Sequence, residues 1–377
     1  MTGQVVLMAA LLLYGAMMVW LAAGLRNGIR HSNRPVAGNL QQPVSVVIPC
    51  RNEPMSLSPL LKHLSEQLEE FPGSEILIAD DHSEPPVSLP VDLPARGIPV
   101  RLIRLAEGEP EGKKAAITAA VHKAANALIL VIDADCIPGR QWVKSMVQPF
   151  SRTGCRMTGG MVKLDTPGRG FTAAAEMLDF YGLAGAAAGA AVQGKPFMCH
   201  GATMAFLKDA FQETGGYASN AEISSGDDVF LMHTIMRKYG AGSFVWNFSP
   251  GGEVLTSPAG SFRSIIRQRL RWASKSRHYT HPMAIMVAVT VLAANLALVA
   301  GTVAAFAGNG ILPVLAAFSL KSLADLPVLL SMTSFFGQRF PVWWYLPVSV
   351  WYPFYTTFTG VLSFFVKTRW KGRTVKN

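Results

Sequence analysis

The sequence is short of charge: only 15% of its 377 residues are Asp, Glu, Lys or Arg, whereas about a quarter of an ordinary soluble protein is charged. Hydrophobic residues make up 50% of the chain. This composition argues against a protein that is soluble throughout. It indicates a membrane protein with a substantial polar part, and the length allows one sizeable soluble domain beside membrane segments.

Cysteine is scarce as well. The four cysteines, Cys50, Cys136, Cys155 and Cys199, include no Cys-x-x-Cys pair, which argues against a zinc site and against a redox motif. We interpret them as reduced thiols of a cytosolic domain, buried as small hydrophobic side chains.

Charge is missing altogether from residues 1–25, 282–320 and 340–366. Val5–Leu25 alone supplies the roughly 20 apolar residues that a helix needs to cross a bilayer. Because no positively charged region precedes this segment and no convincing cleavage site follows it, we predict a retained anchor rather than a signal peptide.

Basic residues flank the uncharged segments, and the formal net charge is +10. Arg26, Arg30 and Arg34 follow the anchor at once, so the positive-inside rule places the chain from residue 26 onward in the cytoplasm. This placement of the basic residues favours a membrane surface over nucleic acid as the partner.

The C-terminal part of the chain contains a topological conflict. Three full spans after a cytoplasmic domain would leave the C-terminus outside, yet the basic tail 367–377 argues for inside. Lys321 and Asp325 stand four residues apart, so on a helix they would share a face and pair. Either their segment is re-entrant or interfacial, or the charge rule fails here.

The chain between Pro43 and about Val254 has the pattern of a soluble α/β domain. Short apolar runs that end in polar residues alternate with helical stretches. The runs are Val44–Ile48, Ile76–Ala79 and Ala127–Ile132, and the helical stretches include Leu57–Glu70 and Ala115–Ala125. This alternation predicts a mostly parallel, doubly wound sheet, in which ligands bind beyond the carboxyl ends of the strands.

Acidic residues lie at those strand ends. Asp80 and Asp81 follow the second run, Asp133 and Asp135 follow the third, and each pair taken alone is also typical of a turn or a helix cap. Asp133 and Asp135 are two apart on an extended segment, so their carboxylates point to the same side. Mg²⁺ or Mn²⁺ would take one or two such carboxylates and complete its shell with phosphate oxygens and water.

A second polar cluster precedes the later apolar segments. Gln268, Arg271 and Trp272 are spaced so that a helix presents them on one side. Arg271 could bind an anionic group in a bidentate way, and Trp272 offers an aromatic face beside it. The alternative is a plain amphipathic interfacial helix with Trp272 as its anchor, because apolar residues form another face and Arg263, Arg267 and Arg269 add positive charge.

Taken together, these motifs resemble family 2 glycosyltransferases of the GT-A fold, and in particular the membrane-bound branch with cellulose synthase, hyaluronan synthase and ceramide glucosyltransferase. The resemblance covers roughly residues 43–275. Its motifs are Pro49–Glu53, Asp80-Asp81, Asp133-Ala134-Asp135, Phe197–Gly201, Gly226-Asp227-Asp228 and Gln268–Trp272. The chain departs from the family pattern in having Asp227 where Glu is usual and His200 inserted before Gly201.

The resemblance implies a Rossmann-like GT-A domain with a mostly parallel sheet, flanked by transmembrane helices, and a role for each motif. Asp81 would hold the nucleoside of a UDP-sugar with Asp80 beside it, and Asp135, more directly than Asp133, would contact the metal. Gln268 and Arg271 would bind the donor, and Trp272 and the Gly201 loop would face the acceptor.

For two further sets of residues that could contact the donor, the sequence is compatible with a second interpretation. Glu53 either lines the nucleotide pocket or caps the helix near Leu57. Lys113 and Lys114 follow Gly112 at an expected helix start, where a phosphate contact and a solvated basic face are both compatible with the sequence.

Asp228 is the candidate general base, since an attacking acceptor hydroxyl must lose its proton as the bond forms. Asp227 would position Asp228 or the acceptor; the alternative for the pair is a helix cap before Val229. One base and a direct displacement would invert the anomeric centre.

The predicted organisation is an anchor (1–26), a cytoplasmic catalytic domain (40–260), an amphipathic interfacial helix (261–281), C-terminal membrane segments (282–366) and a basic cytoplasmic tail (367–377). Phe171–Val192 is either an interfacial helix or a core helix. The leading function is a single sugar transfer to a lipid acceptor at the cell membrane. A processive polysaccharide synthase and a non-catalytic membrane scaffold are the alternatives, and the sugar, the acceptor and the oligomeric state stay open.

Overall fold

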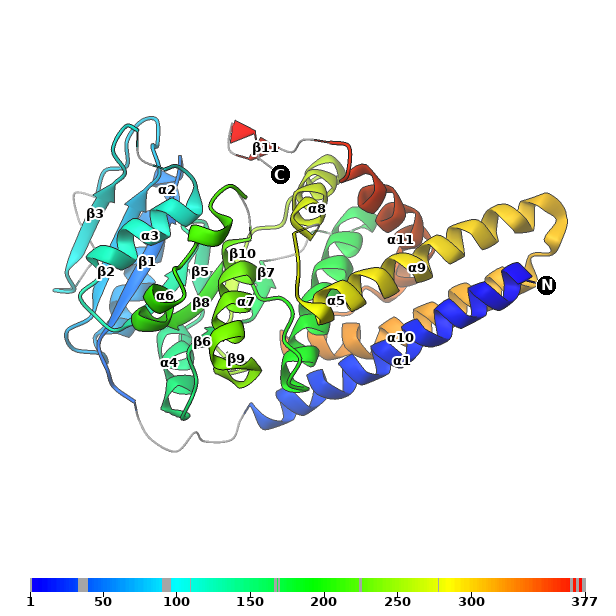
Figure 1. Cartoon of the computed structure of the whole chain (residues 1–377), viewed down its shortest axis with the longest axis horizontal. Coiled ribbons are helices and arrows are strands. Elements are labelled where there is room, and N and C mark those ends of the chain that lie inside the picture. Colours follow the sequence, from blue (N-terminus) through cyan, green and yellow to red (C-terminus); the bar gives the residue numbers. More distant parts are fainter. Residues whose placement is uncertain are drawn as a thin grey trace. The chain divides into compact units, whose positions relative to one another are not determined.

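The chain forms two compact units, each built from separate stretches of sequence (Figure 1). The computed structural model describes residues 2–32, 40–89, 96–108, 110–165, 168, 170–223, 226–276, 278–366, 369–370 and 373–374. The helical unit comprises Met1–Ile29, Thr166–Phe197 and Pro258–Thr368, and the α/β unit comprises Arg30–Asp165, Met198–Ser257 and Arg369–Asn377. The catalytic domain that was expected to be continuous is therefore interrupted by Thr166–Phe197, which packs with the helices.

The α/β unit is built on a seven-stranded sheet. Its strands are β1 (Val44–Cys50), β2 (Glu75–Asp80), β3 (Val100–Arg104), β4 (Leu128–Ile132), β6 (Met157–Gly159), β8 (Thr203–Leu207) and β9 (Phe244–Trp246). They lie in the order β3-β2-β1-β4-β8-β6-β9. Strands β3, β2, β1 and β4 are parallel, β8 is antiparallel to both β4 and β6, and β9 is parallel to β6. The mostly parallel sheet predicted from the alternating pattern is confirmed.

Burial on both faces explains the continuous apolar runs of the central strands. All residues of β2 and β4 are buried, as expected for parallel strands covered by helices on either side. The helix α2 (Pro54–Leu68) covers one face with a stripe of leucines that are wholly buried in the core. The stripe comprises Leu57, Leu60, Leu61, Leu64 and Leu68, at the spacing of one helix face.

The remaining elements of this unit are short. The helices are α3 (Lys113–Lys123), α4 (Trp142–Val147), η1 (Gln148–Ser151), α6 (Lys208–Glu213), η2 (Ala218–Asn220), α7 (Asp227–Tyr239) and η3 (Ala241–Ser243). A small sheet joins β5 (Cys136–Pro138), β10 (Val254–Thr256) and β7 (Val162–Leu164), and a two-stranded ladder joins β11 (Arg369–Trp370) to β12 (Arg373–Thr374). The loops that enter α3 and α7 carry the polar residues considered below.

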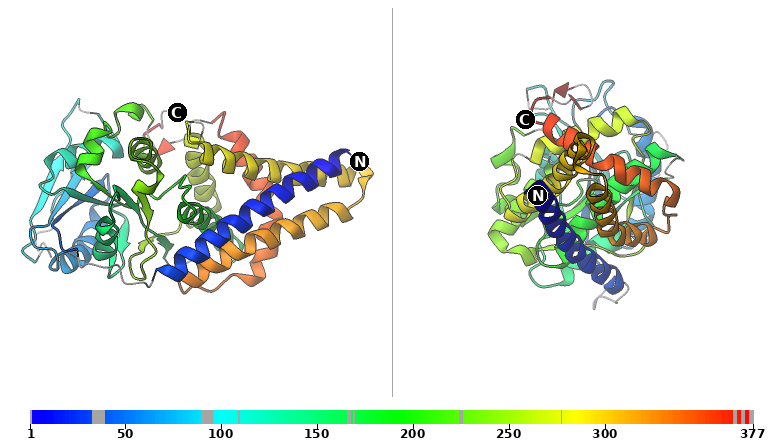
Figure 2. Two further views of the ribbon diagram at one scale, coloured as in Figure 1. Left: turned by 60° about the horizontal axis from the view of Figure 1, so that its bottom comes forward. Right: turned by 90° about the vertical axis from the view of Figure 1, so that its right-hand side faces the viewer.

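The helical unit contains α1 (Thr2–His31), α5 (Phe171–Val192), α8 (Phe262–Ser276), α9 (Pro282–Ala304), η4 (Ala305–Asn309), α10 (Leu312–Phe335) and α11 (Val342–Leu362). Among the described residues, three stretches are long and apolar enough to cross a membrane: Gly3–His31, Pro282–Gly308 and Leu312–Phe335. These three helices run side by side in Figure 1 and Figure 2. The start of α1 and the turn between α9 and α10 lie at the same end, since a Cβ on Gly301 would approach Leu7 to 3.2 Å and Val314 to 3.6 Å.

Helix α5 lies inside the helical unit and packs by close backbone approach. A Cβ on Gly189 would lie 2.1 Å from the carbonyl oxygen of Leu21, and a Cβ on Gly24 would lie 2.2 Å from the carbonyl oxygen of Gly189. Small residues at a crossing allow this approach in membrane helices. This segment is therefore a buried helix of the helical unit.

Lys321 and Asp325 pair within α10 as predicted, with Lys321 Nζ 2.7 Å from Asp325 Oδ2. Tyr14 of α1 donates its hydroxyl hydrogen to the other oxygen of Asp325 at 2.5 Å. The segment around Lys321 is one continuous helix, so the charged pair is accommodated inside a candidate span by mutual neutralisation.

Candidate active site

Lys113 joins three segments of the α/β unit at one point. Its Nζ lies 2.7 Å from Asp133 Oδ1 and 2.9 Å from Asp227 Oδ2, and it donates to the carbonyl oxygen of Gly201 at 3.0 Å. Lys113 begins α3, Asp133 follows β4 and Asp227 begins α7. Acidic residues that are far apart in the sequence thus meet around one ammonium group.

The charges of this cluster perturb one another. Burial works to lower the pKa of Lys113, but the carboxylates of Asp133 and Asp227 outweigh it and hold that pKa above its usual value. Burial raises the pKa of Asp133 to about 6, against the opposing effect of Lys113, while Asp135 and Asp227 add to the rise. Perturbed pKa values of this kind concentrate at functional sites.

Gly201 links this cluster to Asp228. Its backbone amide donates to Asp228 Oδ2 at 2.9 Å, and both Asp227 and Asp228 are buried. A Cβ on residue 201 would lie 2.8 Å from Asp227 Oδ2 and 3.0 Å from Lys113 Nζ. A side chain at this position would therefore displace the ends of Asp227 and Lys113. The two acids are the first residues of α7, but the cap position is Gly226 and no side chain of the described residues caps this helix, so the cap alternative is not seen. Asp228 contacts the loop before β8 through Gly201.

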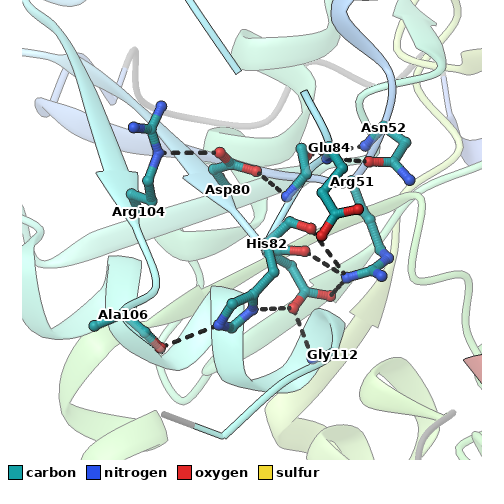
Figure 3. Close-up of polar contacts among 10 residues, drawn as sticks. Arg51, Asn52, Asp80, His82, Glu84, Arg104, Ala106 and Gly112 are labelled. Atoms are coloured by element: carbon teal, nitrogen blue, oxygen red, sulfur yellow. Dashed lines mark hydrogen bonds and ion pairs between the residues drawn. The ribbon is translucent and has the colours of Figure 1, made fainter. Parts of the chain in front are cut away.

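Asp81 is fixed at the residue that precedes α3. Its Oδ1 accepts a hydrogen bond from the amide of Gly112 at 3.0 Å and lies 3.2 Å from Nδ1 of His82 (Figure 3). Arg51 donates to the Asp81 carbonyl oxygen at 2.7 Å. Because Gly112 precedes Lys113, the predicted nucleoside residue and the Lys113 cluster share the entry to one helix.

Asp80 shapes the loop after β2. Its Oδ1 accepts from the amide of Ser83 at 3.0 Å and its Oδ2 from the amide of Val87 at 3.2 Å, and Arg104 Nε lies 3.4 Å from Oδ2 (Figure 3). Asp80 is wholly buried. These contacts give it a structural role, and a direct donor contact for Asp80 stays a prediction without support from this geometry.

Glu53 lies directly before α2 and, among the described residues, its side chain makes no capping hydrogen bond to that helix. The helix-cap alternative is therefore not seen. Its neighbour Asn52 adopts a positive φ of 56°, accepts from the amide of Glu84 at 2.8 Å and donates its own amide to Ser83 at 2.9 Å. The ends of β1 and β2 are thereby locked together beside Asp81.

Two carboxylates could hold a metal ion here. Asp133 is part-buried and Asp135 is exposed, just after the end of β4. Within the described part of the chain, no group of three or more His, Cys, Asp or Glu residues is arranged to hold a metal ion. Two hard oxygen donors fit Mg²⁺ or Mn²⁺ when phosphate oxygens and water complete the shell. The residues present therefore suit a cation shared with a diphosphate better than an all-protein metal site.

Lys114 does not share the role of its neighbour. It is buried and donates to the carbonyl oxygen and Oδ1 of Asn220, at 2.8 and 2.7 Å, and to the carbonyl oxygen of Ile223 at 2.9 Å. Its ammonium also lies 4.8 Å from the centre of the Phe230 ring. The solvated basic face considered for both lysines is therefore wrong, and Lys114 holds the loop that leads to Asp227. Sequence alone gave no signal for this partner.

Gln268, Arg271 and Trp272 lie on α8 in the helical unit, so their part in the site stays a prediction. Ile265 and Leu270 form the buried side of this helix. Arg269 was expected to add to a positive surface. Instead it turns inward, with Nη2 at 2.5 Å from Asp179 Oδ1.

Parts of the chain are similar in sequence to known proteins. The family model described as "Glycosyltransferase like family 2" matches residues 41–275. "Glycosyltransferase AglE" of Haloferax volcanii is 29% identical over 138 residues, which are 37% of this chain and 44% of that protein, so the chain spans less than half of this relative's length.

Among solved structures, the mannosyltransferase PcManGT from Pyrobaculum calidifontis, in complex with GDP-Man and Mn²⁺, is similar with a TM-score of 0.55. The identity is 16%, over 94% of this chain and 99% of that one. At this identity the likeness concerns the fold alone. It confirms the predicted fold class: a mostly parallel α/β sheet like that of GT-A glycosyltransferases, with apolar helices at both ends of the chain.

Proposed function

The chain belongs to glycosyltransferase family 2, and from this premise we propose that it transfers a hexose from a nucleotide-sugar donor to a lipid acceptor at the cytoplasmic face of a membrane. The observation that carries the proposal is the cluster in which Lys113 pairs with Asp133 and Asp227 while Gly201 binds Asp228. A nucleotide-sugar transferase needs these chemistries together: groups for a diphosphate and a base for the acceptor.

Asp228 is proposed as the general base. Its Oδ2 accepts from the Gly201 amide, which fixes the carboxylate in one orientation without neutralising it, and a positioned carboxylate within reach of the acceptor hydroxyl removes the proton as the new bond forms. Direct displacement by that hydroxyl inverts the anomeric carbon. Asp227, paired with Lys113, positions this end of α7.

The donor would lie along the entry of α3. Asp81, held by the Gly112 amide and Arg51, is proposed to contact the nucleoside, and Glu53 to line the same side. Asp135 and Asp133 would hold Mg²⁺ or Mn²⁺. Such a cation, when bound with the donor, stabilises the charge that develops on the leaving diphosphate. Gln268 and Arg271 are proposed to bind the diphosphate and Trp272 the acceptor.

The membrane setting supports a lipid acceptor. The three candidate spans α1, α9 and α10 would put the N-terminus and the α9–α10 turn outside, and would leave both the α/β unit and the basic tail inside. Helix α11, which is rich in aromatic residues, would then stay on the inner side. This arrangement removes the conflict between the number of spans and the charge of the tail. It leaves few spans for a polymer channel, so we favour a single transfer over processive synthesis.

The test is direct. The full chain in lipid vesicles is incubated with Mn²⁺ and a panel of UDP-sugars, with GDP-mannose included because the similar PcManGT structure contains GDP-Man. We expect one donor to give a lipid product whose mass increases by one hexose, and no product with Asp228→Asn. Long polymer would favour the processive alternative, and the absence of transfer from every donor would favour a non-catalytic scaffold.

A further inference from the structure

Helix α5 carries two acids in an otherwise small and apolar sequence. Glu176 and Asp179 are both buried, and burying a carboxylate is costly unless it is paired and hydrogen-bonded. Their neighbours along α5 are mostly Ala, Gly, Leu and Met. The two acids therefore need partners within the helical unit, and the structure shows which these are.

Most of the partners belong to α8 or to the segment that enters it, and the hydroxyl of Tyr352 on α11 also hydrogen-bonds Asp179. Glu176 Oε1 accepts a hydrogen bond from the amide of Ala259 at 2.5 Å, three residues before α8 begins. Asp179 Oδ1 lies 2.5 Å from Arg269 Nη2. The ring of Phe180 lies 6.2 Å from that of Trp272. Glu176, Asp179 and Phe180 are spaced i, i+3 and i+4, so one face of α5 supplies all three contacts.

The contacts span the length of α8. Ala259 lies before its first turn, Arg269 in its second half and Trp272 near its end, so α8 is held at both ends along its axis. Tyr181, the next residue of α5, faces elsewhere and bonds Gln338 after α10. The α8-facing residues are thus a distinct set and not a general feature of the helix.

We propose that α5 positions α8, with Glu176, Asp179 and Phe180 as the positioning residues that set where Gln268, Arg271 and Trp272 are presented. This role would account for the two acids that interrupt the apolar helix. The role of the presented residues rests on the proposed function, but the contact between the helices does not.

The charge environment agrees with this geometry. Burial raises the pKa of Asp179, and Arg269 acts against the rise. Arg269 also donates to the hydroxyl of Tyr352 on α11 at 3.2 Å, and its side chain is only 14% exposed. Removing Asp179 alone would leave a buried guanidinium with a phenol, which cannot neutralise it.

The test uses the full chain in lipid vesicles and three variants: Asp179→Asn, Arg269→Met and the double variant Asp179→Leu/Arg269→Met. A pair of apolar residues commonly replaces a buried ion pair without loss of stability, so the double variant keeps the fold where a single one does not. We expect all three to show a kcat reduced about tenfold or more and raised KM values for both acceptor and donor, because α8 carries Gln268 and Arg271 as well as Trp272. The matched control is Tyr14→Phe, which removes a buried hydrogen bond of the same unit that does not touch α8.

A purely structural role predicts a different result. In that case the double variant would recover wild-type kcat and acceptor KM together with its Tm, and the proposal would be overturned. Amide hydrogen exchange gives a readout that does not need activity. We expect faster exchange for residues 262–276 in Asp179→Asn and no change for residues 282–304. If exchange in α8 is faster in Asp179→Asn than in the wild type but the wild type transfers no sugar, only the proposed function is refuted. Unchanged exchange in Asp179→Asn would refute the positioning role.

Discussion

The amide of Gly201 donates to Asp228 at 2.9 Å while the carbonyl oxygen of the same residue accepts from Lys113. One peptide segment before β8 therefore touches both the candidate base and the candidate phosphate-binding lysine. Because both contacts use backbone atoms of Gly201, a shift of this segment would move the partners of Asp228 and Lys113 together.

Gly201→Ala is expected to reduce activity with little loss of stability. The new Cβ would meet the ends of two side chains, Asp227 Oδ2 at 2.8 Å and Lys113 Nζ at 3.0 Å, and these can shift at small energetic cost. Their shift breaks the Lys113–Asp227 pair. We expect kcat to fall about tenfold, or about 1.4 kcal/mol in activation free energy, with Tm nearly unchanged.

The control for this variant is Gly242→Ala, since a Cβ there has no atom within 4 Å and φ at Gly242 is not in the left-handed region. Its kinetic parameters should equal those of the wild type. A Gly201→Ala protein with wild-type kcat would mean that the Lys113–Asp227 contact does not matter for turnover.

Lys114→Met is expected to loosen the loop that leads to α7. Its three hydrogen bonds to Asn220 and Ile223 would be lost, and each buried acceptor left without a donor costs about 1–3 kcal/mol. Because that loop leads to Asp227 and Asp228, we expect both a lower Tm and a lower kcat. Lys123→Met on the same helix, where the residue is exposed, is the control. Equal Tm values for the two variants would show that Lys114 does not anchor the loop.

Asp135→Ala should weaken donor binding only when a divalent cation is present. The residue is exposed, so its loss should change stability by no more than about 0.5 kcal/mol. Asp133 is the poorer choice for this test because its removal also frees Lys113. Donor affinity is measured by calorimetry with Mn²⁺ and with EDTA, for the wild type, for Asp135→Ala and for Asp209→Ala, an exposed acid on α6.

We expect the wild type and Asp209→Ala to lose affinity in EDTA, and Asp135→Ala to be weak in both conditions. If Asp135→Ala bound the donor like the wild type in Mn²⁺ and responded equally to EDTA, its assignment as a metal residue would be contradicted.

The strands that position the site were predictable because their signal is local. Runs such as β4, with every residue buried, appear in the sequence as unbroken apolar segments, and the acids that follow them lie at the ends of parallel strands. Strand β3 (Val100–Arg104) was missed because two of its five residues are arginines and only Ile103 is buried, as fits a strand at the edge of the sheet.

The assignments that failed depend on partners far away in the sequence. Lys113 and Lys114 are adjacent and chemically identical, yet one faces Asp133 and the other Asn220, more than 100 residues on. Arg269 has the local pattern of a surface residue and pairs with Asp179, 90 residues earlier. A helix face with small residues such as α5 fits a soluble core and a helical bundle equally well. Only the packing partner distinguishes them.

The proposed membrane topology predicts the accessibility of three single-cysteine variants. All four native cysteines are buried, so a membrane-impermeant maleimide should report only the new thiol. Ala307→Cys in the α9–α10 turn should react in intact cells. Glu107→Cys in the α/β unit and Arg339→Cys between α10 and α11 should react only after permeabilisation. The three positions are exposed, so a difference in labelling reflects the membrane and not burial. Labelling of Arg339→Cys in intact cells would mean that α10 does not return to the inner side, and the three-span arrangement would have to be abandoned.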